Sequence, residues 1–186
     1  MRHLAIIGSG PAGYYTAEAA LKQWGDDVRV DIFDMLPVPY GLIRSGVAPD
    51  HQSIKAVSRR YEATNLSENV RFVGNVMVGR DVAIAELREL YDAVVLATHS
   101  TESARLVRAA LPSLPQAAQA PMTQWADTAQ ALRFTAIGTV YALAPSAADT
   151  TGMGHTLAQP MLALRPTPQE PAQFVFDRSH LGGPPG

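Results

Sequence analysis

The sequence predicts an α/β fold in which helices cover both faces of a parallel sheet, followed by a smaller antiparallel β unit. Residues 3–8 and 28–34 are short, apolar, β-branched runs, and the stretch from Pro11 to Gln23 between them is typical of a helix that begins at a proline. A strand, a helix and a strand within about thirty residues form a βαβ unit, whose strands are parallel. The composition changes near Leu111, and ten of the 14 prolines lie after that residue.

We therefore expect two domains, at residues 1–111 and 112–186. After the βαβ unit, the first domain should contain a helix from about His51 to Asn65 with Asp50 as its N-cap, followed by short strands at Val70–Val73 and Val76–Val78. It should then contain a helix through Leu90 that is capped by Asp81, a strand at Asp92–Thr98, and a helix from Ser100 or Thr101 to about Leu111. Residues 93–97 are continuously apolar, which favours a buried parallel strand. The second domain should contain three extended strands, at 134–143, 157–164 and 172–177, without long helices between them, and should end in a disordered Gly/Pro tail.

The composition excludes several classes of function. A net charge of −2 gives no reason to expect a nucleic-acid partner. The absence of cysteine excludes disulfides, thiolate metal sites and catalytic thiols, so any redox chemistry must come from a bound cofactor. The five histidines are scattered without metal-ligand spacing, and we expect no metal site. No apolar run approaches about eighteen residues, so we expect no integral membrane segment and a cytoplasmic location.

The most specific local pattern is Gly-Ser-Gly-Pro-Ala-Gly at residues 8–13, which fits G-x-G-x-x-G directly after a strand and at the start of a helix. Gly8 permits the tight turn, Gly10 allows a pyrophosphate to approach the backbone, and Gly13 allows the helix and the strand to pack closely. The free amides and the helix dipole would hold the anion. We predict a Rossmann-type dinucleotide site, against the alternative of a glycine-rich turn without a ligand.

An acidic residue stands where such a site needs one. Asp34 ends the second strand, 21 residues after Gly13, and its carboxylate can accept hydrogen bonds from the ribose hydroxyls of an ADP group. A carboxylate there would repel a 2′-phosphate, which favours FAD or NAD over NADP at this turn. The long loop from Pro37 to His51 leaves the same edge of the sheet and could lie along an extended cofactor, or could be a rigid surface excursion.

Residues 3–98 resemble the FAD-binding start of the adrenodoxin reductase-like ferredoxin–NADP reductases. The resemblance is carried by the stretches Gly8–Ala17, Leu36–His51, Gly74–Val82 and Tyr91–Thr98. It implies that FAD lies on the glycine turn, with contacts at Ala12, Asp34, Leu42 and Val78. It also implies an activity, in which hydride passes from NADPH to FAD and electrons pass on to a ferredoxin.

Three departures from that family stand out. The family's strand ends Ala-Thr-Gly, whereas this one reads Ala97-Thr98-His99. No second G-x-G-x-x-G/A follows, so NADP is implied by the resemblance alone and its domain is absent here. The later segment that covers the flavin ring is absent too. These departures keep a non-catalytic FAD-binding module open as an alternative.

The remaining residues, from about Ala97 to Gly186, are similar to the squalene-associated FAD-dependent desaturases of the amine-oxidase superfamily. That resemblance is carried by Ala97–Ala104, Thr139–Tyr141, Pro160-Met161 and Phe174–Arg178. It implies a flavoenzyme acting on an apolar substrate as another alternative.

No catalytic residue can be assigned from the sequence. His99 could contact a flavin, but a turn histidine at the start of the next helix is the simpler interpretation. Arg59-Arg60, with Arg71 and Arg80, could dock an acidic ferredoxin, although solvated arginines are the simpler interpretation here too. The oligomeric state is left open.

Overall fold

The computed structural model describes residues 1–47, 52–135, 138, 140 and 157–177. The chain divides into two compact units, Met1–Phe134 and Thr135–Gly186. This division falls after the boundary predicted at residues 111 and 112, because a helix that follows residue 112 packs on the first unit.

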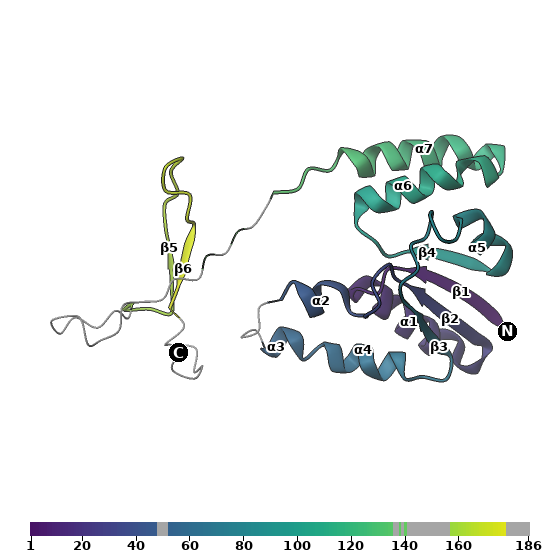
Figure 1. The fold of residues 1–186 in the computed structure, drawn as a ribbon, viewed down its shortest axis with the longest axis horizontal. Helices are drawn as coiled ribbons and strands as arrows, with labels where there is room; N and C mark the ends of the chain where they lie inside the picture. The colour runs from purple at the N-terminus through teal and green to yellow at the C-terminus, as the bar shows by residue number, and fades with distance from the viewer. Residues whose placement is uncertain (48–51, 136–137, 139, 141–156, 178–186) are drawn as a thin grey trace. The chain divides into compact units, whose positions relative to one another are not determined.

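The first unit is built on a four-stranded sheet in the order β3-β2-β1-β4, with every neighbouring pair parallel (Figure 1). The strands are β1 (Arg2–Ile7), β2 (Val28–Phe33), β3 (Val70–Val73) and β4 (Ala93–Leu96). The chain builds outward from β1 to β3 on one side and then returns to place β4 on the other side of β1. The strand order therefore reverses between β1 and β4, which is where open α/β sheets bind their ligands.

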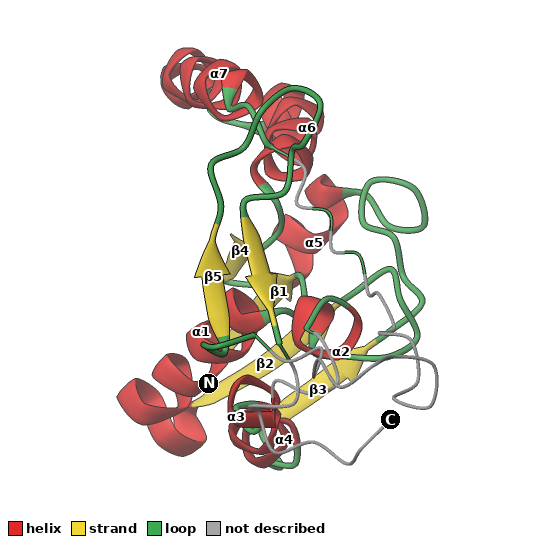
Figure 2. Ribbon diagram, turned by 90° about the vertical axis from the view of Figure 1, so that its left-hand side faces the viewer, coloured by secondary structure: helices red, strands yellow, loops and turns green. Residues whose placement is uncertain are grey.

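Helices cover both faces of this sheet, so the predicted three-layer α/β arrangement is confirmed. In β1, Leu4 and Ile6 point to one face, while Ala5 and Ile7 point to the other. The first face packs on α1 (Pro11–Trp24) and α4 (Ser58–Asn65), and the second on α5 (Ile84–Leu90) and α6 (Ser100–Ala110). Figure 2 shows α4 and α6 on opposite sides of the sheet. Both faces are apolar, as a parallel sheet requires.

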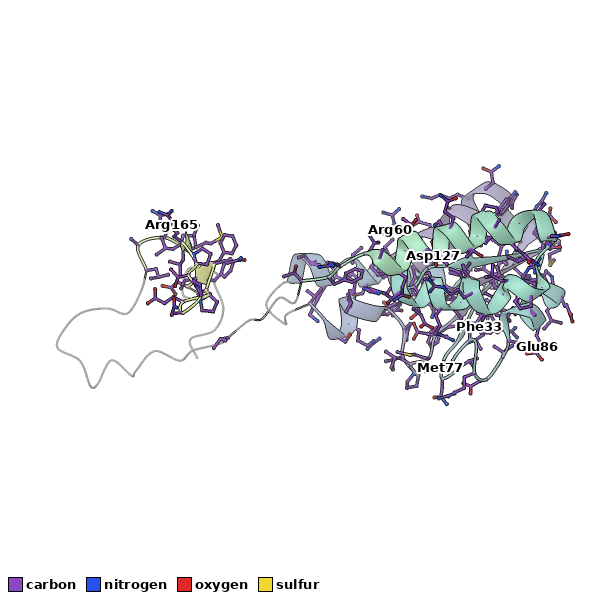
Figure 3. The ribbon with its side chains drawn as sticks, turned by 90° about the horizontal axis from the view of Figure 1, so that it is seen from above. Phe33, Arg60, Met77, Glu86, Asp127 and Arg165 are labelled. Atoms are coloured by element: carbon purple, nitrogen blue, oxygen red, sulfur yellow. The ribbon has the colours of Figure 1, made fainter. Side chains whose placement is uncertain are left out.

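A further helix, α7 (Gln116–Ala131), packs along α6, and the sequence did not predict it. Its small residues Ala126 and Ala129 pack against Ala104 and Val107 of α6. Asp127 of α7, which is labelled in Figure 3, carries a carboxylate. This carboxylate accepts a hydrogen bond at 2.8 Å from Arg108 of α6. The prolines around this stretch disfavour a helix, and one of them, Pro121, lies inside α7. Tertiary packing on α6 overcomes that cost.

Several predicted boundaries in the first unit need correction. The long helix predicted over residues 51–65 is divided into α3 (Gln52–Lys55) and α4, while its proposed N-cap, Asp50, lies outside the described residues. Residues 76–78 form no strand, because Val78 makes only an isolated parallel bridge to Val82. The strand β4 is parallel as predicted, but it lies at the edge of the described sheet and is only half-buried.

The start of α5 also differs from the prediction. Instead of Asp81, the Glu86 carboxylate caps the helix by accepting a hydrogen bond from the Ala83 amide at 2.7 Å. Asp81 accepts the Met77 amide at 2.8 Å and pairs with Arg80, so it closes the preceding turn. Two short 3-10 helices, Gly25–Asp27 and Leu111–Ser113, complete the first unit with α2 (Gly41–Ser45).

The second unit contains an antiparallel pair, β5 (Met161–Ala163) and β6 (Phe174–Phe176). They lie within the predicted strands 157–164 and 172–177. The remaining predicted strand, 134–143, is not confirmed: residues 134, 135, 138 and 140 are not in a strand, and its other residues lie outside the described residues. Residues 178–186 of the expected tail also lie outside the described residues. Among the described residues, no helix has the length and apolar character needed to cross a bilayer.

Candidate functional site

The glycine turn connects β1 to α1 at the carboxyl edge of the sheet. A Cβ on Gly13 would lie 2.0 Å from the carbonyl oxygen of Gly8, and a Cβ on Gly8 would lie 2.6 Å from that of Ala97. Gly8 also has a φ of +110°. A Cβ on Gly10 would meet nothing within 4 Å. Gly8 and Gly13 are therefore required by the fold, while Gly10 faces open space through which a ligand can reach the backbone.

The first turn of α1 presents free amides to this space. Gly10 is the N-cap and provides no side-chain hydrogen bond, and Pro11 occupies the first helical position. The first helical hydrogen bond runs from the Tyr14 amide to the Gly10 carbonyl at 3.1 Å. The amides of Ala12 and Gly13 thus precede the helical ladder, and no acidic side chain lies in this turn. The geometry suits an anion.

Asp34 follows β2 and reaches directly into the turn. Its Oδ2 accepts the Ser9 amide at 2.9 Å and the Ser9 hydroxyl at 2.5 Å, while its Oδ1 accepts the Leu36 amide at 2.9 Å. Its own amide donates to the Val73 carbonyl at 3.1 Å. Through its carboxylate and its backbone amide, Asp34 therefore connects the carboxyl ends of β1, β2 and β3.

The loop after β2 lies against the glycine turn. The Tyr40 amide donates to the Ser9 carbonyl at 3.0 Å, and a Cβ on Gly41 would lie 3.1 Å from the Cα of Gly10. Tyr40 has a φ of +86°, an unusual conformation for a bulky residue. This contact places the loop beside the glycine turn, and it brings α2 and its exposed Leu42 next to the turn.

A group of tyrosines holds Tyr40 in place. Its ring lies 5.2 Å from that of the buried Tyr14 and 6.1 Å from that of Tyr61, and the Arg44 guanidinium lies 5.3 Å from its centre. Burial raises the pKa of the Tyr14 hydroxyl, and burial likewise raises the pKa of Tyr61 to about 12. These phenols stay protonated at neutral pH, so they pack and donate hydrogen bonds rather than act as bases.

Val78 and His99, the other residues that could contact a flavin, lie on segments outside the glycine turn. Val78 is buried in the core beneath α5 and α6, and its carbonyl accepts a hydrogen bond from Arg105 at 3.0 Å. His99 is the N-cap residue of α6 without a side-chain cap, and its Nδ1 lies 2.9 Å from the Thr101 hydroxyl. Its ring lies 4.1 Å from that of Phe134. The structure thus places Gly8, Gly10, Ala12, Gly13 and Asp34 together and Val78 on a separate loop.

The arginines considered for partner docking are mostly paired within the chain. Arg60 forms a bidentate pair with Glu18, and Arg80 pairs with the adjacent Asp81. Arg71 forms a bidentate pair with Asp31. These carboxylates neutralise three of the four arginines, so the structure favours the simpler interpretation of this cluster.

Two residues of the site were not found from the sequence. Ser9 occupies a variable position of the glycine pattern, and its type gives no indication that it bonds to Asp34, 25 residues away. Tyr40 lies between a proline and a glycine, which indicates a turn but not its left-handed backbone.

Together, the sheet order, the glycine turn and the acid after β2 define a Rossmann-type α/β domain whose glycine turn has the geometry of a dinucleotide site. The family of NAD(P)-binding Rossmann-like domains matches residues 6–71.

Curated relatives match the same region of the chain, as the resemblance to the ferredoxin–NADP reductases predicted. Cindoxin reductase of Citrobacter braakii is 50% identical over 94 residues, which are 50% of this chain and 21% of the relative. The mitochondrial NADPH:adrenodoxin oxidoreductase of Homo sapiens is 52% identical over 93 residues, 50% of this chain and 18% of the relative. The chain spans about a fifth of the length of these relatives.

A solved structure shows the same likeness. The structure of Mycobacterium tuberculosis FprA in complex with NADPH superimposes with a TM-score of 0.51 at 46% identity, over 54% of this chain and 23% of that one. These matches cover about half of the chain, and the similarity of residues 97–186 to the desaturases stays a prediction.

Proposed function

We propose that the first unit binds FAD and serves a flavoprotein oxidoreductase of the ferredoxin–NADP reductase type. The observation that carries this proposal is the uncapped start of α1 at Gly10, open to a ligand, with Asp34 fixed beside it. The relatives are reductases by name, which supports an electron-transfer role. The proposed contacts are Gly8, Gly10, Ala12, Gly13 and Asp34, together with Leu42 and Val78.

The residues present suit an ADP-containing cofactor. The amides of Ala12 and Gly13 would bond the pyrophosphate, and the absence of a side chain on Gly10 leaves the room that a phosphate needs. Asp34 would accept a ribose hydroxyl, and its charge disfavours a 2′-phosphate at this position. FAD, when bound, accepts hydride and releases electrons singly, and this chain's residues bind and orient it.

NADPH as the hydride donor and a ferredoxin-type acceptor are proposed from the relatives. One is named an NADPH-ferredoxin reductase and covers 52% of this chain at 48% identity. The sequence has only one G-x-G-x-x-G, which we assign to FAD, so the nicotinamide would need a different surface. Three of the four arginines that could dock a ferredoxin are paired with carboxylates of the same chain. This pairing supports the alternative of an FAD-binding module that obtains its activity with another chain.

The test uses the purified full chain. We expect a flavin absorption spectrum, or stoichiometric uptake of added FAD measured by fluorescence quenching, together with NADPH-dependent reduction of an artificial acceptor. Binding of FAD without NADPH turnover would favour the binding module. Reduction of bound flavin by an isoprenoid or an amine, without nicotinamide, would favour the desaturase-like alternative. A chain that takes up no FAD in excess would refute the proposal.

A further inference from the structure

We infer that Ser9 restricts Asp34 to a single ribose hydroxyl, which makes Ser9 a specificity-determining residue of the nucleotide site. This inference rests on the proposed function, because it concerns how the adenosine ribose would be held. The two hydroxyls of a ribose could each bond a free carboxylate, one to each oxygen. The contacts of Asp34 within the chain remove that option.

Groups of the chain itself already occupy most of the hydrogen-bond acceptor positions of the Asp34 carboxylate. An ionised carboxylate offers about four acceptor positions, two on each oxygen. On Oδ2, the Ser9 amide at 2.9 Å and the Ser9 hydroxyl at 2.5 Å occupy both. On Oδ1, the Leu36 amide at 2.9 Å occupies one. One acceptor position remains, on Oδ1.

Ser9 cannot easily release the carboxylate. Its side chain is buried, with no exposed area, so its hydroxyl needs an acceptor inside the protein. Its carbonyl accepts the Tyr40 amide at 3.0 Å, and its amide already bonds Asp34. All three polar groups of Ser9 are therefore fixed by partners in the chain, and a rotation of Asp34 toward the ligand would leave a buried hydroxyl unpaired.

Leu36 fixes the other oxygen from the opposite side. Its amide bonds Oδ1, and its carbonyl accepts the Asn75 amide at 3.1 Å, which ties this part of the loop to the turn after β3. The carboxylate is thus held between two backbone segments. A ribose would meet one preformed acceptor, and its second hydroxyl would face either the backbone or water.

The experiment compares three nucleotides on the full chain by isothermal titration calorimetry: ADP, 2′-deoxy-ADP and 3′-deoxy-ADP. We expect one deoxy analogue to bind about ten-fold or more weaker than ADP, since it loses a hydrogen bond to a charged group, and the other to bind within about two-fold of ADP. Equal losses for both analogues, or no loss for either, would overturn the inference. ADP that does not bind at all would overturn this inference, whereas the proposed function is decided separately by the FAD titration of the same chain.

Two variants assign the selectivity to Ser9. Ser9→Ala frees an acceptor position on Oδ2, so the difference between the two analogues should shrink to less than about three-fold while ADP still binds. Ser9→Thr keeps the hydroxyl and should restore the wild-type preference. This ratio of affinities does not move when a variant is merely less stable. An unchanged ratio in Ser9→Ala would show that Ser9 does not set the selectivity, and the wild-type comparison decides the single-acceptor claim even if that variant fails to fold.

Discussion

Two alanine substitutions in the glycine turn should have separable effects: Gly13→Ala should lower the stability of the fold, and Gly10→Ala should lower the affinity for FAD. In Gly13→Ala the new Cβ would lie 2.0 Å from the backbone oxygen of Gly8, where no flexible side chain can move aside. Helix α1 would have to shift from β1. Overpacking costs about 1–3 kcal/mol and occasionally more, and a backbone clash this short belongs at or above about 3 kcal/mol. For a chain of this size the melting temperature should fall by about 6–12 °C.

Gly10→Ala should behave in the opposite way. Its Cβ would meet nothing within 4 Å, and a φ of −78° suits alanine. Reduced freedom of the unfolded chain stabilises by about 0.4–1 kcal/mol, while alanine is a poorer N-cap than glycine by a similar amount. We expect stability within about 1 kcal/mol of wild type.

The same methyl group would occupy the space assigned to the pyrophosphate. FAD affinity of Gly10→Ala should therefore fall by about 1–3 kcal/mol, which is about five- to 150-fold in Kd. Unfolding followed by circular dichroism and FAD titration by fluorescence measure the two effects. The reasoning is refuted if Gly10→Ala keeps full FAD affinity, or if Gly13→Ala melts at the wild-type temperature.

Three further comparisons test other parts of the first unit. At Tyr40, whose φ is +86°, Tyr40→Gly should be about 1 kcal/mol more stable than Tyr40→Ala in urea unfolding, because both lose the ring and only glycine relieves the backbone; equal stabilities would argue against strain. The Arg60 guanidinium, with a lysine one turn away, lowers the pKa of Glu18 from 4.5 to about 2, so Glu18 contributes stability that is present above pH 4.5 and lost as the pH falls toward 2. The difference in stability between wild type and Glu18→Gln should accordingly shrink between pH 4.5 and pH 2, as measured by thermal unfolding at a series of pH values. A difference that does not change with pH would contradict the lowered pKa of Glu18. In the α6–α7 contact, Ala126→Leu at a fully buried position should cost about 1–3 kcal/mol, whereas Asp127→Ala at an exposed ion pair should cost less than about 1 kcal/mol; similar costs would mean that α7 is not packed as described.

Short local sequence patterns determined the part of the first unit that would bind the nucleotide. The β1-α1-β2 unit, the glycine turn and Asp34 could be predicted because each depends on a short stretch: an apolar run sets a strand, and Gly8 and Gly13 are the residues that a tight turn and a close helix require. The parallel sheet with helices on both faces follows from the order of these elements.

Contacts between residues far apart in the sequence determined the other features of the fold and the site, and no local sequence pattern predicts such contacts. Helix α7 forms despite Pro121, because the small side chains in its contact with α6 allow close packing that offsets the lost backbone hydrogen bond. The left-handed backbone of Tyr40 is held by rings from α1 and α4. Likewise, Ser9 and Asp34 are 25 residues apart and meet only because β1 and β2 pair in parallel, which brings their carboxyl ends to one edge of the sheet. The sequence alone predicts the acid of the proposed site, and only the tertiary structure decides how many of its acceptor positions remain for a ligand.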